Sequence, residues 1–441
     1  MNNSFKPDSS DWASIFISWQ RKKLVYVSII LFLNSAGGVY YIYYLIENGY
    51  LPSPFLYDKS NTFMDFFNFL YWAYDDGRYT NWSSVYPPLG FVILRVFNFV
   101  FAGAGYGDPE LMRDNSQFVI AGVCLIYLAV PAIILKLKYW QSFSVIEKIL
   151  TYLTILLSTP MLFTLERGNF ILLSPILLAF ALSKVGVARC LSIALLINLK
   201  PYFALLMIYY ITRKNLKGFV TCCIMTGLIF SISGLVLDDR FLFFFKNLFN
   251  FAQEAELFSL REVMALPSSI SAFSYVLKHP DGALFASGFL GTASISIIAF
   301  LVEAVKWSVL TISLVVVFMR SRLMRDAEVL ALLVVIISNL GIWVGGYTYI
   351  LYIVLIPVII KMSKKWFYIG LISIIALPLD IVPLLGNFIG EQHSYLTDSS
   401  ANIYWTLGLG SVIRPIVNLI LLVYLSVEFL ARKSESANTS I

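Results

Sequence analysis

The sequence is poor in charged residues and in histidine. Only 13% of its 441 residues are charged, whereas 59% are hydrophobic. Soluble domains carry about a quarter charged residues and are roughly half apolar, so this composition excludes an ordinary soluble domain. With two histidines in the whole chain, the sequence also excludes a His-rich metal centre.

Cysteine is equally scarce. The four cysteines all lie within apolar blocks: Cys124, Cys190, Cys222 and Cys223. Buried thiols in such surroundings behave as small hydrophobic groups. We therefore expect neutral thiols, with no disulfide and no cysteine metal site.

Apolar residues, by contrast, come in successive blocks that are long enough to cross a bilayer, which needs about 20 residues. The sequence predicts an all-α polytopic membrane helix bundle, forming a single domain over 1–441. The first block, Val25–Ile46, follows a polar segment and precedes no small-residue cleavage pattern, which favours a retained span over a signal peptide. We expect about ten full spans, at 24–46, 117–135, 148–165, 170–184, 217–237, 297–319, 327–345, 347–361, 366–385 and 411–430.

The net charge of +6 does not indicate nucleic acid, because the basic residues form short clusters at the ends of apolar runs. Such clusters mark the cytoplasmic side of a membrane protein. Placing all of them inside leaves most acids outside, in a first extracytoplasmic loop at 47–116 and a second at 238–296. The second loop has the pattern of amphipathic helices that lie on the outer face of the membrane. The segment 89–105 has the pattern of a further surface helix. The compact loops favour a bacterial cytoplasmic membrane.

One apolar block, 190–211, contains Lys200-Pro201 at its middle. Proline breaks or kinks a helix at such a position. Two half-helices that turn at Lys-Pro keep every later basic cluster inside, whereas one kinked span is the alternative. A lysine at membrane depth is tolerated where it lines a polar cavity, so we expect Lys200 to face one.

Three polar sites fall on the outer side: the first-loop acids, Glu166–Asn169 and Lys200. One cavity would collect all three. Asp65 lies among phenylalanines, and burial would raise its affinity for protons, which suits a general base. An amphipathic helix with this acid facing water is the alternative. Asp75 and Asp76 precede Gly77, which is typical of a solvated turn.

The segment Glu166–Asn169 has two interpretations. In the first, Glu166 and Arg167 form an ion pair that caps two span ends. Alternatively, Asn169 opens the next helix, whose free N–H groups attract an anion, and Arg167 and Lys200 add positive charge. Together these groups would suit the phosphate of a lipid. A divalent ion between Asp65 and Asp75 or Asp76 is left open.

The order of these motifs resembles glycosyltransferase family 87, in the GT-C superfamily of polyprenyl-phosphate-sugar-dependent enzymes. The matching positions are Asp65, Gly77–Tyr79, Tyr86–Pro88, Arg167–Asn169 and Lys200-Pro201, together with the late aromatic turn in Gly345–Pro357. The resemblance covers roughly residues 25–360. It implies a GT-C-like fold and a cell-envelope enzyme that needs no cofactor.

The resemblance further implies inverting transfer of a sugar from a polyprenyl-phosphate donor to a hydroxyl of a glycolipid or glycan acceptor, outside the membrane. Asp65 would be the general base. The residues expected to bind substrate are Tyr79, Tyr86, Glu166, Arg167, Asn169, Lys200, Tyr347 and Tyr349. Alternatives are a polysaccharide polymerase that uses a lipid-diphosphate-linked oligosaccharide, and a flippase or transporter. Transport is disfavoured because the acids gather on one face rather than in symmetry-related halves.

Overall fold

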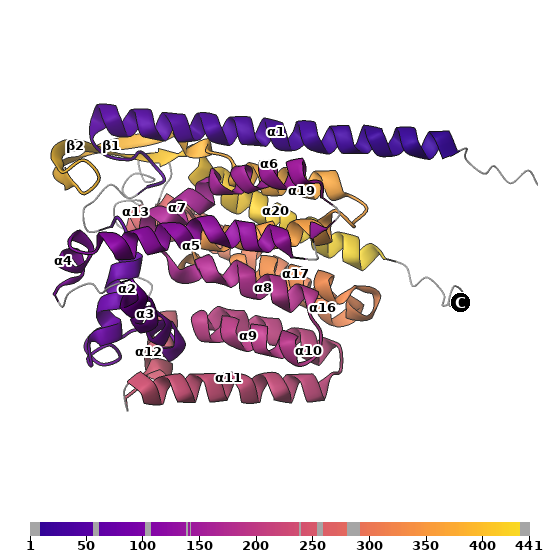
Figure 1. The fold of residues 1–441 in the computed structure, drawn as a ribbon, viewed down its shortest axis with the longest axis horizontal. Coiled ribbons are helices and arrows are strands. Elements are labelled where there is room, and N and C mark those ends of the chain that lie inside the picture. Colours follow the sequence, from indigo (N-terminus) through magenta and orange to yellow (C-terminus); the bar gives the residue numbers. More distant parts are fainter. Residues whose placement is uncertain are drawn as a thin grey trace, which may run out of the picture.

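The structure, a computed structural model, describes residues 9–55, 61–101, 107–137, 140–141, 143–237, 240–253, 259–279 and 292–432. Within these ranges the chain is mainly helical and has several helices apolar enough to cross a membrane, so a helical membrane protein is confirmed. Figure 1 shows most helices running along one direction, stacked side by side.

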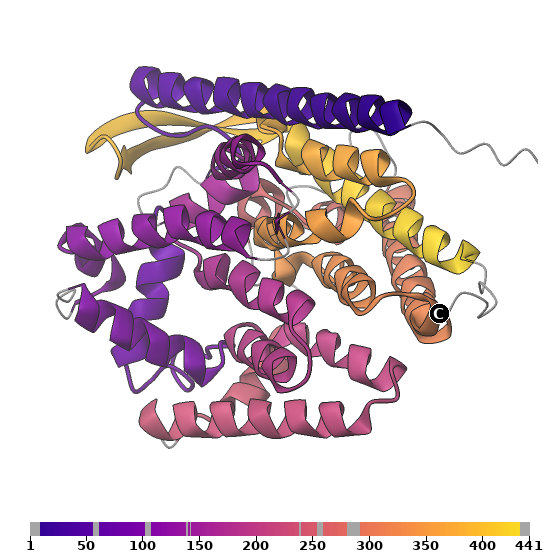
Figure 2. The same cartoon turned by 45° about the vertical axis from the view of Figure 1, so that its right-hand side comes forward.

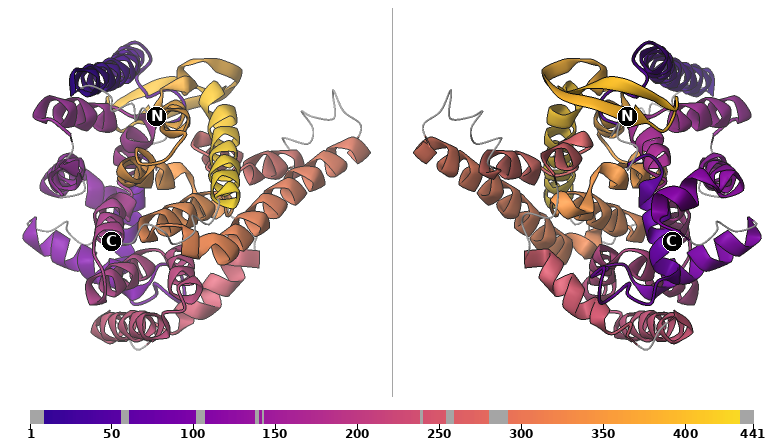
Figure 3. Two further views of the ribbon diagram at one scale, coloured as in Figure 1. Left: turned by 90° about the vertical axis from the view of Figure 1, so that its right-hand side faces the viewer. Right: turned by 90° about the vertical axis from the view of Figure 1, so that its left-hand side faces the viewer.

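Five helices of the described chain are long and apolar enough to span a bilayer, and the pair α6 and α7, bent by 54°, counts as a sixth. They are α1 (Ser9–Asn48), α5 (Gln117–Lys136), α6 (Val145–Leu156), α7 (Thr159–Arg167), α11 (Leu216–Leu237), α16 (Thr292–Arg320) and α20 (Leu409–Ala431). Figure 2 shows α1 along one edge of the bundle, and Figure 3 shows α16 running outward from its body.

The other predicted spans are shorter helices. These are η2 (Phe170–Leu173) with α8 (Ser174–Ser183), α17 (Asp326–Ser338) with η5 (Ile342–Val344), η6 (Gly346–Leu351) with α18 (Tyr352–Ile359), and α19 (Lys365–Ala376) with η7 (Leu379–Ile381). The short η4 (Ser321–Leu323) lies between two predicted spans. Helix α17 is buried from Glu328 to Ser338 and forms the centre of the largest apolar core. Helix length alone supports five or six spans, and the count of ten stays a prediction.

The block 190–211 reverses direction at Lys200-Pro201. It forms α9 (Val187–Leu199), then η3 (Pro201–Met207) and α10 (Ile208–Thr212). The Cys190 thiol at the start of α9 lies 3.1 Å from the Tyr210 hydroxyl near the end of α10. The two halves therefore run antiparallel, as Figure 1 also shows, and the half-helix pair is confirmed over a single kinked span.

The predicted outer loops contain short helices, which gather with the end of α1 at one end of the bundle (Figure 1). They are α2 (Met64–Tyr74), α3 (Pro88–Val100), α4 (Pro109–Asp114), α12 (Phe243–Gln253), α13 (Leu260–Ala265) and α14 (Ser271–Lys278). Parts of the second loop, at 238–239, 254–258 and 280–291, lie outside the described residues. At the end of helix α2, Arg78 Nε donates to the Trp72 carbonyl (2.8 Å) and Arg95 Nε donates to the Ala73 carbonyl (2.6 Å). Cations are favourable at a helix C-terminus, because its last carbonyl groups carry partial negative charge.

A β-hairpin corrects the all-α prediction. Strands β1 (Pro383–Ser394) and β2 (Ser399–Gly408) pair antiparallel, with Phe388 opposite Tyr404. The helix expected over 366–385 ends at Ala376, because Pro378 and Pro383 cannot continue it. Ala401 and Ile403 of the hairpin pack on Tyr50, so that the hairpin covers the chain just beyond α1.

Candidate functional site

The site begins where α7 ends. Gly168 adopts a left-handed conformation (φ 64°) that terminates the helix, and a Cβ at this position would lie 2.9 Å from the Cβ of Phe66 on α2. The backbone N–H of Phe63 donates to the Glu166 carbonyl at 2.7 Å. The close approach that glycine permits therefore places the first turn of α2 directly on the turn after α7.

Asp65, in that first turn, accepts hydrogen bonds from three side chains on two distant segments. Arg167 Nη2 lies 2.6 Å from its Oδ1, while Asn169 Nδ2 and the Tyr347 hydroxyl lie 2.8 Å and 2.7 Å from its Oδ2. The predicted convergence of Asp65, Arg167 and Asn169 is confirmed, and Tyr347 joins them. A side chain that faces bulk water is excluded.

The proton affinity of Asp65 differs from the expectation. Burial by itself raises the pKa of a carboxyl group, but the Arg167 guanidinium and the hydrogen bonds from Asn169 and Tyr347 outweigh it. Together they hold the pKa of Asp65 below its ordinary value. The prediction of a raised affinity for protons is wrong for this arrangement, because the short distance between Asp65 and Arg167 cannot be read from the sequence.

Arg167 is held on its other side by Asn61, a residue that no sequence signal indicated. Arg167 Nη1 donates to the Asn61 carbonyl (2.9 Å) and to its side-chain Oδ1 (2.7 Å). Its Nε is buried and finds no acceptor among the described residues. Asn169 Oδ1 accepts from Ile171 N at 3.0 Å, so one N–H group expected to attract an anion is already bound.

These groups line a cavity of about 700 Å³, shared by Asp65, Arg167, Asn169, Tyr347 and Lys200. The expectation that Lys200 faces a cavity is confirmed. Its Nζ lies 4.2 Å from the centroid of the Tyr86 ring, and no carboxylate of the described chain pairs with it. One wall of the cavity therefore carries a cation that is stabilised by an aromatic face but not neutralised.

The rest of the cavity wall is aromatic and polar. It includes Trp72, Trp82, Tyr202, Asn247, Asn250, Glu262 and Trp343. None of these seven residues was expected to bind substrate, because none occupies a position of the motifs that indicated the site. Rings and amide groups of this kind suit a ligand with flat apolar faces and hydroxyl groups.

The other first-loop acids lie in a turn, as predicted. Asp75 Oδ1 accepts from the Gly77 N–H (2.6 Å) and its Oδ2 from Trp82 Nε1 (2.7 Å), while the Asp76 side chain is 88% exposed. Since the oxygens of Asp65 and Asp75 are each engaged with separate donors, the two acids do not fit a shared divalent ion. No cluster of three or more His, Cys, Asp or Glu side chains occurs in the described ranges.

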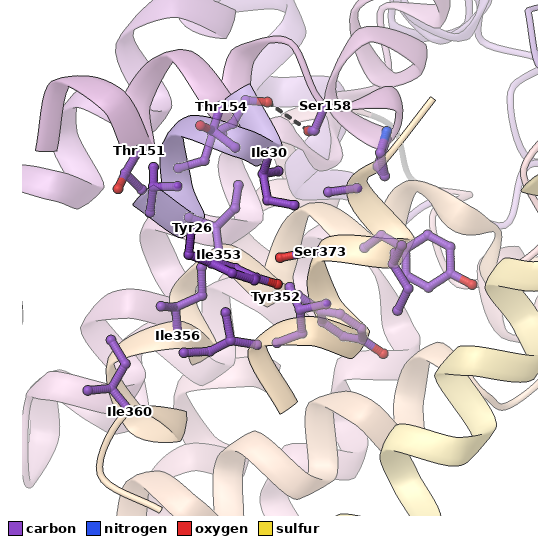
Figure 4. A pocket seen from close by; sticks show the side chains of 18 of the residues that line it. Tyr26, Ile30, Thr151, Thr154, Ser158, Tyr352, Ile353, Ile356, Ile360 and Ser373 are labelled. Atoms are coloured by element: carbon purple, nitrogen blue, oxygen red, sulfur yellow. Dashed lines mark hydrogen bonds between the residues drawn. The ribbon is translucent and has the colours of Figure 1, made fainter. Parts of the chain in front are cut away.

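Three residues expected to bind substrate do not line this cavity. Tyr79 is buried and donates to the Tyr86 carbonyl (3.1 Å), and Glu166 is buried beside Arg167. Tyr349 donates to the Pro267 carbonyl (3.0 Å) and lines a second cavity of about 130 Å³ between α1, α6, α18 and α19. Figure 4 shows that this second cavity is mainly apolar. The motifs locate segments, but which side chain of a segment faces the cavity depends on packing.

Chemically, the large cavity combines the Asp65 carboxylate, two cations from separate turns and several aromatic rings at the end of the bundle where the predicted outer loops gather. Comparison with protein families, with curated proteins and with solved structures finds no match to this chain.

Proposed function

We propose that this protein is a membrane glycosyltransferase of the GT-C type, similar to family 87. It would move a sugar from a polyprenyl-phosphate donor to a hydroxyl of a glycolipid or glycan on the extracytoplasmic face of the cytoplasmic membrane. The observation that carries the proposal is the bonding of Asp65 to Arg167, Asn169 and Tyr347 in a cavity that Lys200 also lines.

The two cations would receive the donor phosphate. Lys200 has no carboxylate partner in the described chain, and Arg167 keeps a buried Nε–H without an acceptor there. As the bond between the anomeric carbon and the phosphate oxygen breaks, the electron pair goes to the phosphate, and its growing charge is stabilised by fixed cations. Because the leaving group is already an anion, no protein acid has to protonate it.

Asp65 would receive the proton of the acceptor hydroxyl while the acceptor oxygen bonds to the anomeric carbon on the opposite face, with inversion. In the arrangement described above, Arg167 lowers the proton affinity of Asp65. A donor phosphate that competes for the Arg167 guanidinium weakens this ion pair and makes Asp65 a better base. Asn169 and Tyr347 would keep the carboxylate oriented while the pair loosens.

The size and lining of the cavity fit two sugar rings. Small-molecule sites commonly span about 300–1,000 Å³, and this cavity has about 700 Å³. Trp72, Trp82 and Trp343 offer flat faces for the sugars, and Asn250 offers amide hydrogen bonds. The lipid chain of the donor would remain in the bilayer.

The test uses purified protein in liposomes, supplied separately with polyprenyl-phosphate sugars and with lipid-diphosphate-linked oligosaccharides. We expect transfer from the former only, and a loss of about 10²–10⁴-fold in rate for Asp65→Asn, the usual contribution of a general base. Asp76→Asn is the matched control, because Asp76 is exposed and lies outside the cavity. Turnover of the diphosphate donor alone would assign a polymerase, and a loss of only twofold for Asp65→Asn would remove Asp65 from the chemistry.

A further inference from the structure

Helix α12 lies between the cavity and the outside of the molecule. One of its faces lines the cavity through Asn247, Leu248, Asn250 and Phe251. Asn247 Nδ2 also donates to the carbonyls of Tyr79 (2.8 Å) and Ser84 (3.2 Å), which fixes α12 to the first outer segment. The helix is therefore part of the wall of the candidate site.

The opposite face of α12 is apolar and exposed. Phe245 is 56% exposed and Phe249 is 66% exposed. Phe245 and Phe249 are four residues apart and thus lie on one side of the helix. Exposed Lys246 is the single basic residue of this helix. Large aromatic side chains gathered on one helix face mark an interaction surface rather than a water-exposed one.

The position of α12 identifies what covers this face. The rings of Phe244 and Phe245 lie 5.4 Å and 5.1 Å from that of Phe230 on α11. Phe230 precedes the end of α11 by seven residues, or about 10 Å at 1.5 Å per residue. Helix α12 therefore meets α11 about two turns before the end of a helix that is long and apolar enough to span a bilayer. That depth corresponds to the boundary between acyl chains and headgroups.

The neighbouring surface continues the same apolar face. Helix α3 packs beside α11 and exposes Phe99 (86%) and Val96 (58%), while Leu235 near the end of α11 is also exposed. The exposed face of α12 is thus an extension of a surface that already faces lipid on α11. A basic residue beside such a face is suited to lipid phosphate groups.

We propose that α12 is embedded in the outer-leaflet interface, with Phe245 and Phe249 among acyl chains and Lys246 at lipid phosphate groups. Because its other face lines the cavity, α12 is also the wall beside which a lipid-linked ligand passes from the bilayer into the site. The bilayer contact stands by itself, whereas the passage of a lipid-linked donor rests on the proposed function.

Spin labels test the bilayer contact. Cysteines replace Phe245, Phe249 and, as an aqueous control, Asp76, in protein whose four native cysteines are changed to alanine. The labelled protein is placed in vesicles of zwitterionic and anionic phospholipid. Labels at Phe245→Cys and Phe249→Cys should collide more with oxygen, which concentrates in the bilayer, than with a water-soluble nickel chelate. The label at Asp76→Cys should collide more with the nickel chelate than with oxygen. A water-like profile at 245 and 249, or protection from both reagents by a second copy of the chain, would overturn the proposal.

Activity measurements test the route. The double variant Phe245→Ser/Phe249→Ser should lose at least tenfold in rate with a long-chain donor in bilayers, but at most twofold with a water-soluble short-chain donor. The control is Phe300→Ser/Phe318→Ser, which alters two exposed rings of α16 away from the cavity. Equal losses with both donors would refute the route. Failure of the unaltered protein with both donors would refute the proposed function, and the route with it, while the spin labels decide the bilayer contact.

Discussion

At the scale of single residues, three aspartates in the same outer segment have different surroundings. Asp75 and Asp76 belong to a turn, while Asp65 is bonded by Arg167, Asn169 and Tyr347. The difference does not come from local sequence, because two of the partners lie about 100 residues away and the third lies 282 residues away. An ionised carboxylate that accepts these hydrogen bonds stabilises the folded protein.

The first prediction concerns acid stability. Because the pKa of Asp65 is lower in the folded protein than its ordinary value of 3.8, its contribution is complete above that value and is lost as the pH falls through the folded pKa. We expect Asp65→Asn to cost about 2 kcal/mol at pH 7, as hydrogen bonds to a charged group do, and clearly less near pH 3. Thermal unfolding in detergent at both pH values measures this. Equal shifts at pH 7 and pH 3 would contradict an ionised Asp65.

At the scale of elements, the site depends on chain reversals at glycine and proline. The turn after α7 uses Gly168, and the turn of the α9–η3 hairpin uses Lys200-Pro201. Gly346 is another close approach, since a Cβ there would lie 2.2 Å from the Leu266 carbonyl oxygen, immediately before Tyr347. These reversals place Arg167, Lys200 and Tyr347 in one cavity.

The second prediction compares two glycines with positive φ. Gly168 and Gly186 have φ values of 64° and 61°, but only Gly168 has a neighbouring segment, at Phe66, that an added Cβ would displace. Gly168 (ψ 29°) has a left-handed helical conformation, in which alanine costs about 1 kcal/mol. Gly186 (ψ −136°) lies in a region that is essentially restricted to glycine, in which alanine costs about 1–3 kcal/mol, so its alanine variant is at least as strained. We expect Gly168→Ala alone to reduce sugar transfer, by at least tenfold, because it separates Arg167 from Asp65. Similar activity in both variants would show that the tight packing of the turn on α2 is dispensable.

At the scale of the whole molecule, the end opposite the cavity is held by ion pairs of the predicted cytoplasmic residues. Arg189 and Arg213 both pair with Asp326, at 2.8 Å and 3.1 Å. Buried Glu328 pairs with Arg325 and Arg432, at 2.7 Å and 2.8 Å. The basic clusters thus join α9, α10, α17 and α20 at one end of the bundle (Figure 1), as expected if that end faces the cytoplasm.

The third prediction is the orientation in the membrane. Single cysteines at Asp76, in the outer turn, and at Arg322, beyond α16, are compared in the background without native cysteines. A membrane-impermeant maleimide added to intact cells should label Asp76→Cys at once and Arg322→Cys only after the membrane is opened. Labelling of both without permeabilisation, or of Arg322→Cys alone, would place the cavity on the other side or refute the charge-based topology.

The sequence by itself determined the helical membrane character and the segments that form the site. Long apolar runs require helices in a bilayer, because a helix bonds its own backbone polar groups, and a proline inside one run predicts a break or a kink there. The Asp-Gly turn at Asp75–Gly77 follows from local chemistry in the same way. Whether the chain kinks or reverses at Lys200-Pro201 was decided by the structure.

Only the tertiary structure decided which side chains meet and how they are charged. The roles of Asn61 and Trp343, the burial of Tyr79 and the lowered pKa of Asp65 all depend on contacts between remote segments. The hairpin of β1 and β2 likewise owes its place to packing on Tyr50. Side-chain direction and electrostatic interaction vary over a few ångströms, and periodicity along one chain does not encode distances between turns that lie a hundred residues apart.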